Sequence, residues 1–364
     1  MMNKLLIAFP LTFVVGGGAL GWTAVSAPAQ APLDGAELTW RVPAGTTLSR
    51  EITSKHYLVC ERMTVQQGED SSISQRLFDL QTSTTVRTTD DVLEVSGERP
   101  TKMRRYYDEA RLTASRETSR GDARTVDRRI AGEGSIKSQG VVFTWIPEDG
   151  EYGRYFDATE GVEETLPGLG EDLGFRSLMP AEKIAEGASW DLPPGALADF
   201  FACGGDLNFA LTEGKDQNLL RTLRFGTGAF LGDVFGAEEK GTVKATWRST
   251  EEKDGLRLAV IDLVFDIQIS KDMRDLASST LPPAQRMAGY QVESALVSLS
   301  LKGGGEVRWD LGLGGLHSCE EIKADETVQT QLKLTVGAEG DRVEHSQELL
   351  MKGTLVHSVS AVIK

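Results

Sequence analysis

The chain has 364 residues, with 39 basic and 54 acidic side chains that give a net charge of −15 at pH 7. This acidity opposes non-specific binding to nucleic acid and to anionic membranes, so neither is expected as a partner. With 40% apolar residues, the chain is long enough to bury the core of one large domain or two ordinary ones.

The N-terminus has the three-part layout of a secretory signal peptide. Lys4 supplies a positive charge, an apolar run follows over 5–20, and small residues occupy 25–31. We expect cleavage after Ala29, because the neighbouring small-residue cuts would leave a proline as the first residue. The mature protein is then exported, to the periplasm or the medium. It keeps 38 basic and 54 acidic residues, a net charge of −16.

An uncleaved membrane anchor is the alternative reading of the same stretch. Residues 5–25 are just numerous enough to span a bilayer as a helix. However, Pro10 and the glycines at 16–18 interrupt the apolar run, and small residues follow it. We therefore expect no transmembrane anchor after signal cleavage.

Apolar and polar residues alternate through most of the chain after residue 36, which is typical of half-buried strands. This pattern predicts a mainly β fold of antiparallel sheets, sandwich-like or half-barrel-like, with a few short helices in the middle. Turn signals separate the strands at Ser96-Gly97, Asp254-Gly255 and 303–305. The clearest alternating runs are 38–42, 243–247, 307–313 and 328–336.

One predicted strand changes phase. Leu258 and Val260 share one parity, whereas Ile261 and Leu263 begin the other. A β-bulge near Val260 and Ile261 would keep both sets on the core side. The alternative is a strand that is buried on both faces. Either reading makes this strand long and central.

Glycine, proline and acidic residues interrupt the alternation over 147–206. Inside this stretch, a proline pair precedes a short helix expected over 195–203, which Gly204 ends. We therefore expect a β-rich N-terminal half over 30–146, a connecting region over 147–206 and a β-rich C-terminal half over 207–364. The halves form two domains or one body, because edge strands need partners or cover.

The chain contains no recognised catalytic or metal motif. It lacks a Gly-x-Ser-x-Gly elbow and a His-Glu-x-x-His pair, and none of its four histidines lies in a catalytic context. His56 and Cys60 share a strand face but are about 13 Å apart, too far for a direct pair. We therefore expect no catalytic residue, no cofactor and no metal.

The three cysteines are Cys60, Cys203 and Cys319. An odd number in an exported protein allows at most one internal disulfide, and all three pairings are open. Their spacing matches no zinc or redox motif. Buried or singly paired structural cysteines are the expectation.

One segment departs from the acidity of the chain. Residues 99–129 contain ten basic and five acidic side chains, a charge of +5. Four arginines spaced by four would share one face in a helix or in a strand, and arginine suits bidentate contact with carboxylate or phosphate. The alternative is a solvated strand pair balanced by the acidic excess of the protein. The candidate anion- or partner-binding face consists of Arg104, Arg105, Arg116, Arg120, Arg124 and Arg128.

The segment over 179–190, in which Pro180 is followed by Gly187 and Trp190, resembles a segment of a poorly characterised family of exported bacterial β-rich proteins. The stretch over 96–100, followed by basic strand-like residues, resembles the same proteins. The resemblance implies no activity and no ligand. By its own chemistry, Trp190 is expected to anchor the connecting region onto a sheet.

These features favour a non-enzymatic binding or interaction protein of the bacterial envelope, whose partner is an unknown envelope protein or an apolar small molecule. The first alternative is a carrier that holds a lipid-type molecule on a concave sheet face. The second is a hydrolase that uses a carboxylate pair which the sequence does not reveal.

Overall fold

The computed structural model describes most of the chain after residue 37. The expected signal peptide over 1–29 lies outside the described residues, as does Cys203. No helix within the described part is long and apolar enough to cross a membrane. The described residues are 38–68, 70–75, 78–97, 99–120, 123–158, 161, 163–170, 176–201, 204–205, 207–214, 234–235, 238–279, 281, 283–337 and 343–363.

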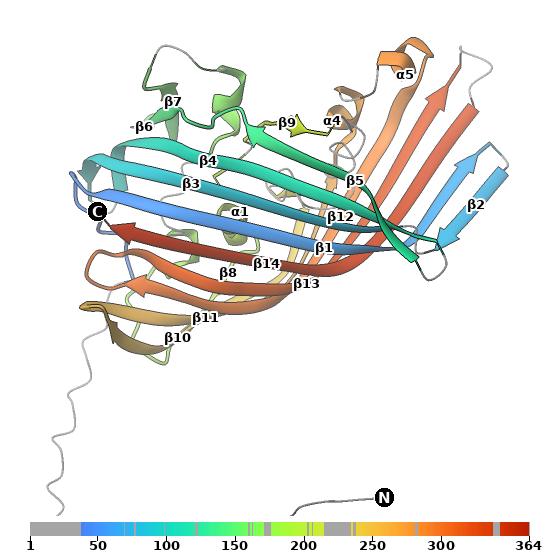
Figure 1. Ribbon diagram of the computed structural model, residues 1–364. Helices are drawn as coiled ribbons and strands as arrows, with labels where there is room; N and C mark the ends of the chain where they lie inside the picture. Colours follow the sequence, from blue (N-terminus) through green and yellow to red (C-terminus); the bar gives the residue numbers. More distant parts are fainter. Residues whose placement is uncertain are drawn as a thin grey trace, which may run out of the picture. The chain divides into compact units, whose positions relative to one another are not determined.

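Antiparallel strands make up 71% of the structure and form one large sheet that does not close (Figure 1). The mainly antiparallel β fold predicted from the sequence is therefore confirmed. The main path across the sheet is β7-β6-β4-β3-β1-β14-β13-β12-β11-β10-β8, while β2 pairs with β1 and β5 pairs with β4 and β9. The strands of the described residues are β1 (Thr47–Gln67), β2 (Asp70–Gln75), β3 (Phe78–Ser96), β4 (Arg99–Arg120), β5 (Ala123–Gly134), β6 (Gly140–Ile146), β7 (Glu151–Phe156), β8 (Ser189–Leu192), β9 (Phe209–Glu213), β10 (Glu238–Lys253), β11 (Leu256–Asp272), β12 (Gln291–Asp310), β13 (Gly315–Val336) and β14 (Val343–Ile363).

Side chains alternate between two faces along the long strands. On β11, Leu263, Phe265 and Ile267 are buried, while the intervening Val264 is exposed. A strand places successive side chains on opposite faces, so this alternation defines a buried face and an open face. We call the buried one the inner face and the opposite one the outer face.

The first and last described strands join the two β-rich halves of the sequence. β1 pairs with β14 from Leu48↔Ile363 to Gln67↔His345. Both halves therefore belong to one sheet, within the compact unit Gly35–Lys364. Buried side chains from both halves form one continuous core cluster.

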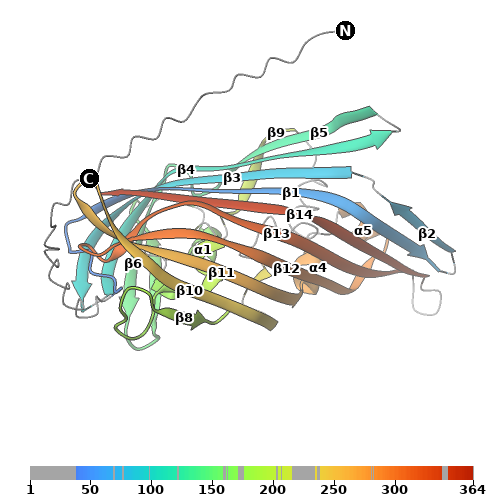
Figure 2. The ribbon, with the colours of Figure 1, turned by 90° about the horizontal axis from the view of Figure 1, so that it is seen from below.

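Short helices lie on the inner side of the curled sheet (Figures 1 and 2). The helix predicted after the proline pair is confirmed as α1 (Ala196–Phe201), and Phe201 of α1 packs against Phe265 with ring centroids 5.8 Å apart. Trp190 lies in β8, which pairs with β10, and its indole N–H donates to the carbonyl of Leu178 at 3.0 Å. The other helices of the described residues are the 3₁₀ helices Glu163–Gly168 and Arg176–Leu178, α4 (Arg274–Ser279) and α5 (Pro283–Met287).

The glycine run over 303–305 is not a turn, which corrects the sequence-based prediction. β12 continues through it as one strand. A Cβ at Gly303 would lie 2.0 Å from the carbonyl oxygen of Lys323, and one at Gly304 would lie 2.2 Å from that of Leu263. The neighbouring backbones thus approach β12 too closely for any side chain, and this is the reason for glycine inside a central strand.

The alternating run over 38–42 is buried but forms no strand, which is a second correction. Leu38, Trp40 and Val42 are almost fully buried, yet this segment is not part of the sheet. It crosses the end of the sheet instead, where the amide of Arg41 donates to the carbonyl of Gly314 at 3.2 Å. A buried non-strand segment with this spacing imitates a strand pattern.

The predicted bulge lies on the neighbouring strand. The pairing of β10 with β11 shifts between Trp247 and Ser249, which face Ile261 and Val260. Arg248 of β10 is therefore the extra residue. Since Val260 and Ile261 are both buried, this part of β11 is also covered on both faces, as the alternative reading proposed.

Candidate functional site

The arginine-rich segment folds as the hairpin of β4 and β5. Arg104 and Arg105 are consecutive on β4 and therefore point to opposite faces. On the outer face, the guanidinium of Arg104 lies 2.7 Å from the carboxylate of Asp91 and 3.4 Å from that of Asp157. The Arg104 contact holds the pKa of Asp91 below its usual range.

Arg105 is buried on the inner face, so it is not part of an exposed surface as the sequence suggested. Its Nε lies 2.8 Å from Oδ1 of Asp90, and Arg50 contacts the same carboxylate. Burial acts to raise the pKa of Asp90, but the two guanidinium groups more than offset this and hold the pKa below its usual range. This cluster is structural, because a buried carboxylate needs such partners.

The four arginines spaced by four do not lie on one strand. β4 ends at Arg120 and β5 begins at Ala123, so the chain reverses between them. Arg116 and Arg128 face each other across the two strands, and the Arg116 guanidinium lies 5.8 Å from the ring centroid of Phe78. The side chains of Arg120 and Arg124 lie outside the described residues.

A groove of about 630 Å³ crosses the outer face over β14, β1, β3, β4 and β5. Lys55, Arg111 and Arg129 line it, and all three are exposed. Glu213 of β9 is the one carboxylate residue in its lining. The strand register aligns two rows of lining side chains, Lys55-Ser83-Thr113-Ala131 and Tyr57-Gln81-Ser115-Arg129.

The three cations of the groove make no ion pair with any described residue. By contrast, Arg87 and Arg104 on the same face are each held by two carboxylates. Unpaired positive charge in a concave surface attracts anions more strongly than the same charges dispersed on a flat one. Sequence analysis included Arg111 and Arg129 in the basic segment but not among its six candidates.

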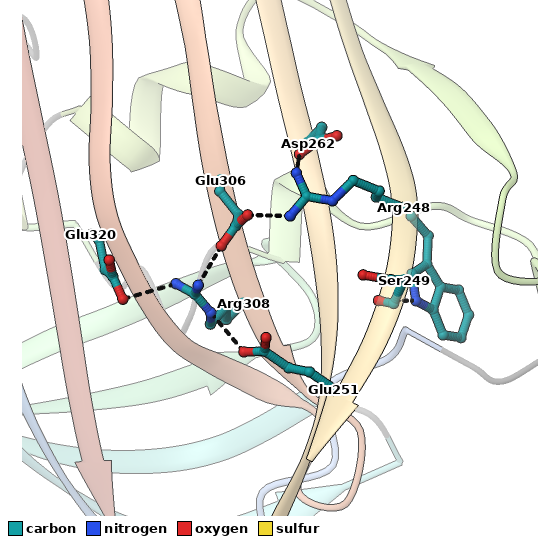
Figure 3. A network of polar contacts seen from close by, with 8 residues as sticks. Arg248, Ser249, Glu251, Asp262, Glu306, Arg308 and Glu320 are labelled. Atoms are coloured by element: carbon teal, nitrogen blue, oxygen red, sulfur yellow. Dashed lines mark hydrogen bonds and ion pairs between the residues drawn. The ribbon is translucent and has the colours of Figure 1, made fainter. Parts of the chain in front are cut away.

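Elsewhere, the outer face carries a network with more acidic than basic groups (Figure 3). Arg308 of β12 bonds to Glu251 at 2.8 Å and to Glu320 at 3.1 Å, and it also contacts Glu306. Arg248 joins the network through Glu306 and Asp262. Two arginines thus link four carboxylates on four strands. The outer face therefore carries the basic groove at one place and, over β10 to β13, a network in which carboxylates outnumber arginines by two to one.

The inner face brings together polar side chains that are far apart in the sequence. Ser54 Oγ lies 2.7 Å from Nδ1 of His357, and Nδ1 of His56 lies 2.9 Å from Oε2 of Glu326. All four side chains are buried. Sequence reasoning missed this cluster, because its members come from three strands and only the register of β14 with β1 and β13 brings them together.

The cluster does not have the geometry of a catalytic triad. Serine contacts Nδ1 of His357, whereas the carboxylate contacts a different histidine. Phe200 of α1 covers the His357 ring, with centroids 4.6 Å apart. Burial, with a smaller contribution from His56, lowers the pKa of His357 to about 3, so the ring is neutral at pH 7.

The cysteines of the described part are buried. Cys60 faces Met351 and Cys319 faces Val359 on the shared neighbour β14. Those positions are about 27 Å apart along the strand, so Cys60 and Cys319 cannot be bridged. Cys319 is a free thiol whose pKa burial raises to about 12. Among the described residues, no group of three or more His, Cys, Asp and Glu side chains could hold a metal ion.

No protein-family model and no curated protein matches this chain.

Proposed function

We propose that the protein is an exported, non-enzymatic binding protein of the bacterial envelope that holds an acidic segment of a partner protein in the outer-face groove. The observation that carries this proposal is a set of three cations, Lys55, Arg111 and Arg129, that line one groove of an acidic protein and form no ion pair with a described residue. The N-terminal signal pattern supports export.

The spacing of the cations fits an extended peptide. Arg129 of β5 lies opposite Ser115 of β4, four residues from Arg111, so the two arginines are about 14 Å apart along the strands. Carboxylates at positions i and i+4 of an extended chain are also about 14 Å apart and lie on the same side. Lys55 of β1 lies between the two arginines along the strand direction, because its register row includes Thr113 of β4. Gln81, Thr113 and Ser115 add hydrogen-bonding side chains along the path.

Arginine and lysine at such a site act mainly on specificity and association rate. Their charges attract an acidic partner, and salt weakens the attraction because exposed charges are screened over about 10 Å at 0.1 M. The acidic network around Arg308 would repel the same partner from β10 to β13. The partner is thereby confined to the groove side of the outer face.

The two alternatives have less support. For the apolar-ligand carrier, Phe200 and Phe201 of α1 occupy the inner face where they pack on His357 and Phe265. For the hydrolase, the buried carboxylates of Asp90 and Glu326 are each held by their own basic partners on different strands. Among the described residues of the inner face, no observation favours either alternative over the groove.

The test is binding of a fluorescein-labelled octaglutamate peptide, followed by fluorescence anisotropy. One variant reverses the groove charges (Lys55→Glu, Arg111→Glu, Arg129→Glu). A matched control reverses three exposed cations over β10 and β12 (Lys240→Glu, Lys244→Glu, Lys302→Glu), so both variants have the same net charge.

The proposal predicts salt-dependent binding that falls by at least about tenfold in the groove variant and changes little in the control. Equal losses in both variants would show a general charge effect and overturn the proposal. Absence of peptide binding would also overturn it. Binding of anionic phospholipid vesicles without binding of the peptide would indicate that the partner of the groove is a lipid surface and not a protein.

A further inference from the structure

A pocket of about 340 Å³ lies at the end of the sheet where β14 ends. It is separate from the outer-face groove and from the buried cluster on the inner face. Five elements form it, namely the segment before β1, the start of β1, the β10–β11 turn, the β12–β13 turn and the end of β14. Its apolar lining includes Trp40, Val42, Leu48, Leu256, Leu316 and Ala361.

Two large apolar side chains at the end of β14 extend this lining toward solvent. Val362 is 60% exposed and Ile363 is 41% exposed, and both line the pocket. Single exposed apolar residues are common and need no explanation. Here, however, they adjoin a concave apolar surface, so an apolar ligand would cover them as it enters.

The ionisable groups of the pocket lining are two carboxylates, one arginine and His317. Asp310 is 4% exposed; its Oδ1 accepts hydrogen bonds from the amides of Gly312 at 2.7 Å and Leu313 at 3.1 Å. Its Oδ2 receives no hydrogen bond from any described residue. Asp254 adds a second carboxylate, whereas the one arginine of the lining, Arg50, is already held by Asp90.

We propose that this pocket binds a medium-length aliphatic molecule whose head group is a hydrogen-bond donor, an ammonium or a hydroxyl. A cavity of about 150 Å³ accommodates benzene, so a pocket of 340 Å³ has room for roughly ten carbons. The acidic groups favour a donor over a carboxylate head, because an unpaired buried acceptor is costly and a second anion would be repelled. This site is independent of the groove.

The experiment is isothermal titration calorimetry of the mature protein with decylamine, decanol and decanoate, each below its micelle-forming concentration. The expected order is binding of decylamine and decanol, with decanoate at least about tenfold weaker. Absence of binding by the first two ligands, or equal binding of decanoate, overturns the proposal.

Variants locate the binding. Ala361→Leu fills the pocket and should abolish binding of all ligands. Val362→Ser should weaken binding several-fold, whereas Val264→Ser, a change at a similarly exposed valine (62%) on β11 outside the pocket lining, should leave it unchanged.

Asp310→Asn distinguishes the two head groups. This change should weaken the binding of decylamine at least about tenfold and change the binding of decanol little, because an amide neither attracts an ammonium as an anion does nor repels a hydroxyl. Circular dichroism and the melting temperature establish that each variant is folded. Unchanged binding in Ala361→Leu, or equal losses in Val362→Ser and Val264→Ser, also overturns the proposal.

Discussion

His56 on β1 and Glu326 on β13 meet across the strand that separates them, with Nδ1 and Oε2 2.9 Å apart. On the intervening β14, the residue opposite Glu326 is Gly353, which also faces Leu58 of β1. Because glycine has no side chain, β14 presents none opposite Glu326, whereas Leu355 lies opposite His56. The contact therefore joins the N-terminal and C-terminal halves inside the core, beyond the backbone pairing.

The neighbouring His357 makes stability depend on pH. Its pKa is about 3 in the folded protein, against an ordinary value of 6.5, so the unfolded chain takes up a proton that the folded protein does not. This contribution is constant above pH 6.5. Below it, the free energy of unfolding should fall by roughly 1 kcal/mol for each pH unit until about pH 3.

The measurement is urea denaturation of the wild type and of His357→Gln between pH 7 and pH 4. The variant should show a shallower decline, because glutamine does not titrate. His345→Gln is the matched control, since His345 is only partly buried on the same strand, and it should keep the wild-type slope. Equal slopes for all three proteins would contradict the contribution of His357 to the pH dependence of stability. Titration of the His357 ring by NMR gives an independent answer if His357→Gln does not fold.

Asp90 should be far more important for stability than Asp91 beside it. Asp90→Asn leaves Arg50 and Arg105 buried without their counter-charge, and breaking such a cluster costs about 3–5 kcal/mol. Asp91→Asn removes a partly exposed pair with Arg104, which is worth about 0–1 kcal/mol. Chemical denaturation of both variants at pH 7 measures the difference. Similar losses would show that the buried cluster is not a special contributor.

The same Asp90 cluster adds to acid sensitivity. Because the pKa of Asp90 is lower in the folded protein than in the unfolded chain, its contribution is present above the unfolded pKa and is lost as the pH falls through the folded one. The free energy of unfolding of Asp90→Asn, measured against pH, should therefore lack this loss at acidic pH.

Glycine at position 304 is required by the approach of its neighbour. Gly304→Ala places a Cβ 2.2 Å from the carbonyl oxygen of Leu263 on β11, so the backbones must separate. We expect a loss of about 1–3 kcal/mol or more. Gly315→Ala is the control, because its Cβ would meet only Val42 at an ordinary 3.5 Å. Thermal unfolding compares the two, and equal melting temperatures would contradict the close approach.

The sequence predicted the class of fold because period-two alternation reports directly on strands with one buried face. The prediction failed for residues that are buried without belonging to a strand and for residues that belong to a strand without showing the alternating pattern. Trp40 alternates and is buried but belongs to no strand, and the glycines at 303–305 look like a turn although they permit close strands. In each case the deciding factor is a neighbouring backbone far away in the sequence.

The candidate site was only partly predictable for the same reason. The basic character of 99–129 was visible, and Arg111 and Arg129 of the groove belong to it. Lys55 enters the groove only through the register, in which β1 pairs with β3 and β3 with β4. Fourfold spacing was misleading, because the hairpin reverses before Ala123.

The acidic network of the outer face should depend on Arg308 more than on Arg248 (Figure 3). The Arg308 side chain is 15% exposed and holds Glu251, Glu306 and Glu320 together, whereas that of Arg248 is 52% exposed. Arg308→Gln leaves three carboxylates without a shared counter-charge. It should lower the free energy of unfolding by about 1–2 kcal/mol at low salt. Arg248→Gln should cost less than about 1 kcal/mol. Because salt screens exposed charges, urea denaturation in high salt should narrow the gap; a gap that salt leaves unchanged would indicate that Arg308 acts by packing instead of charge.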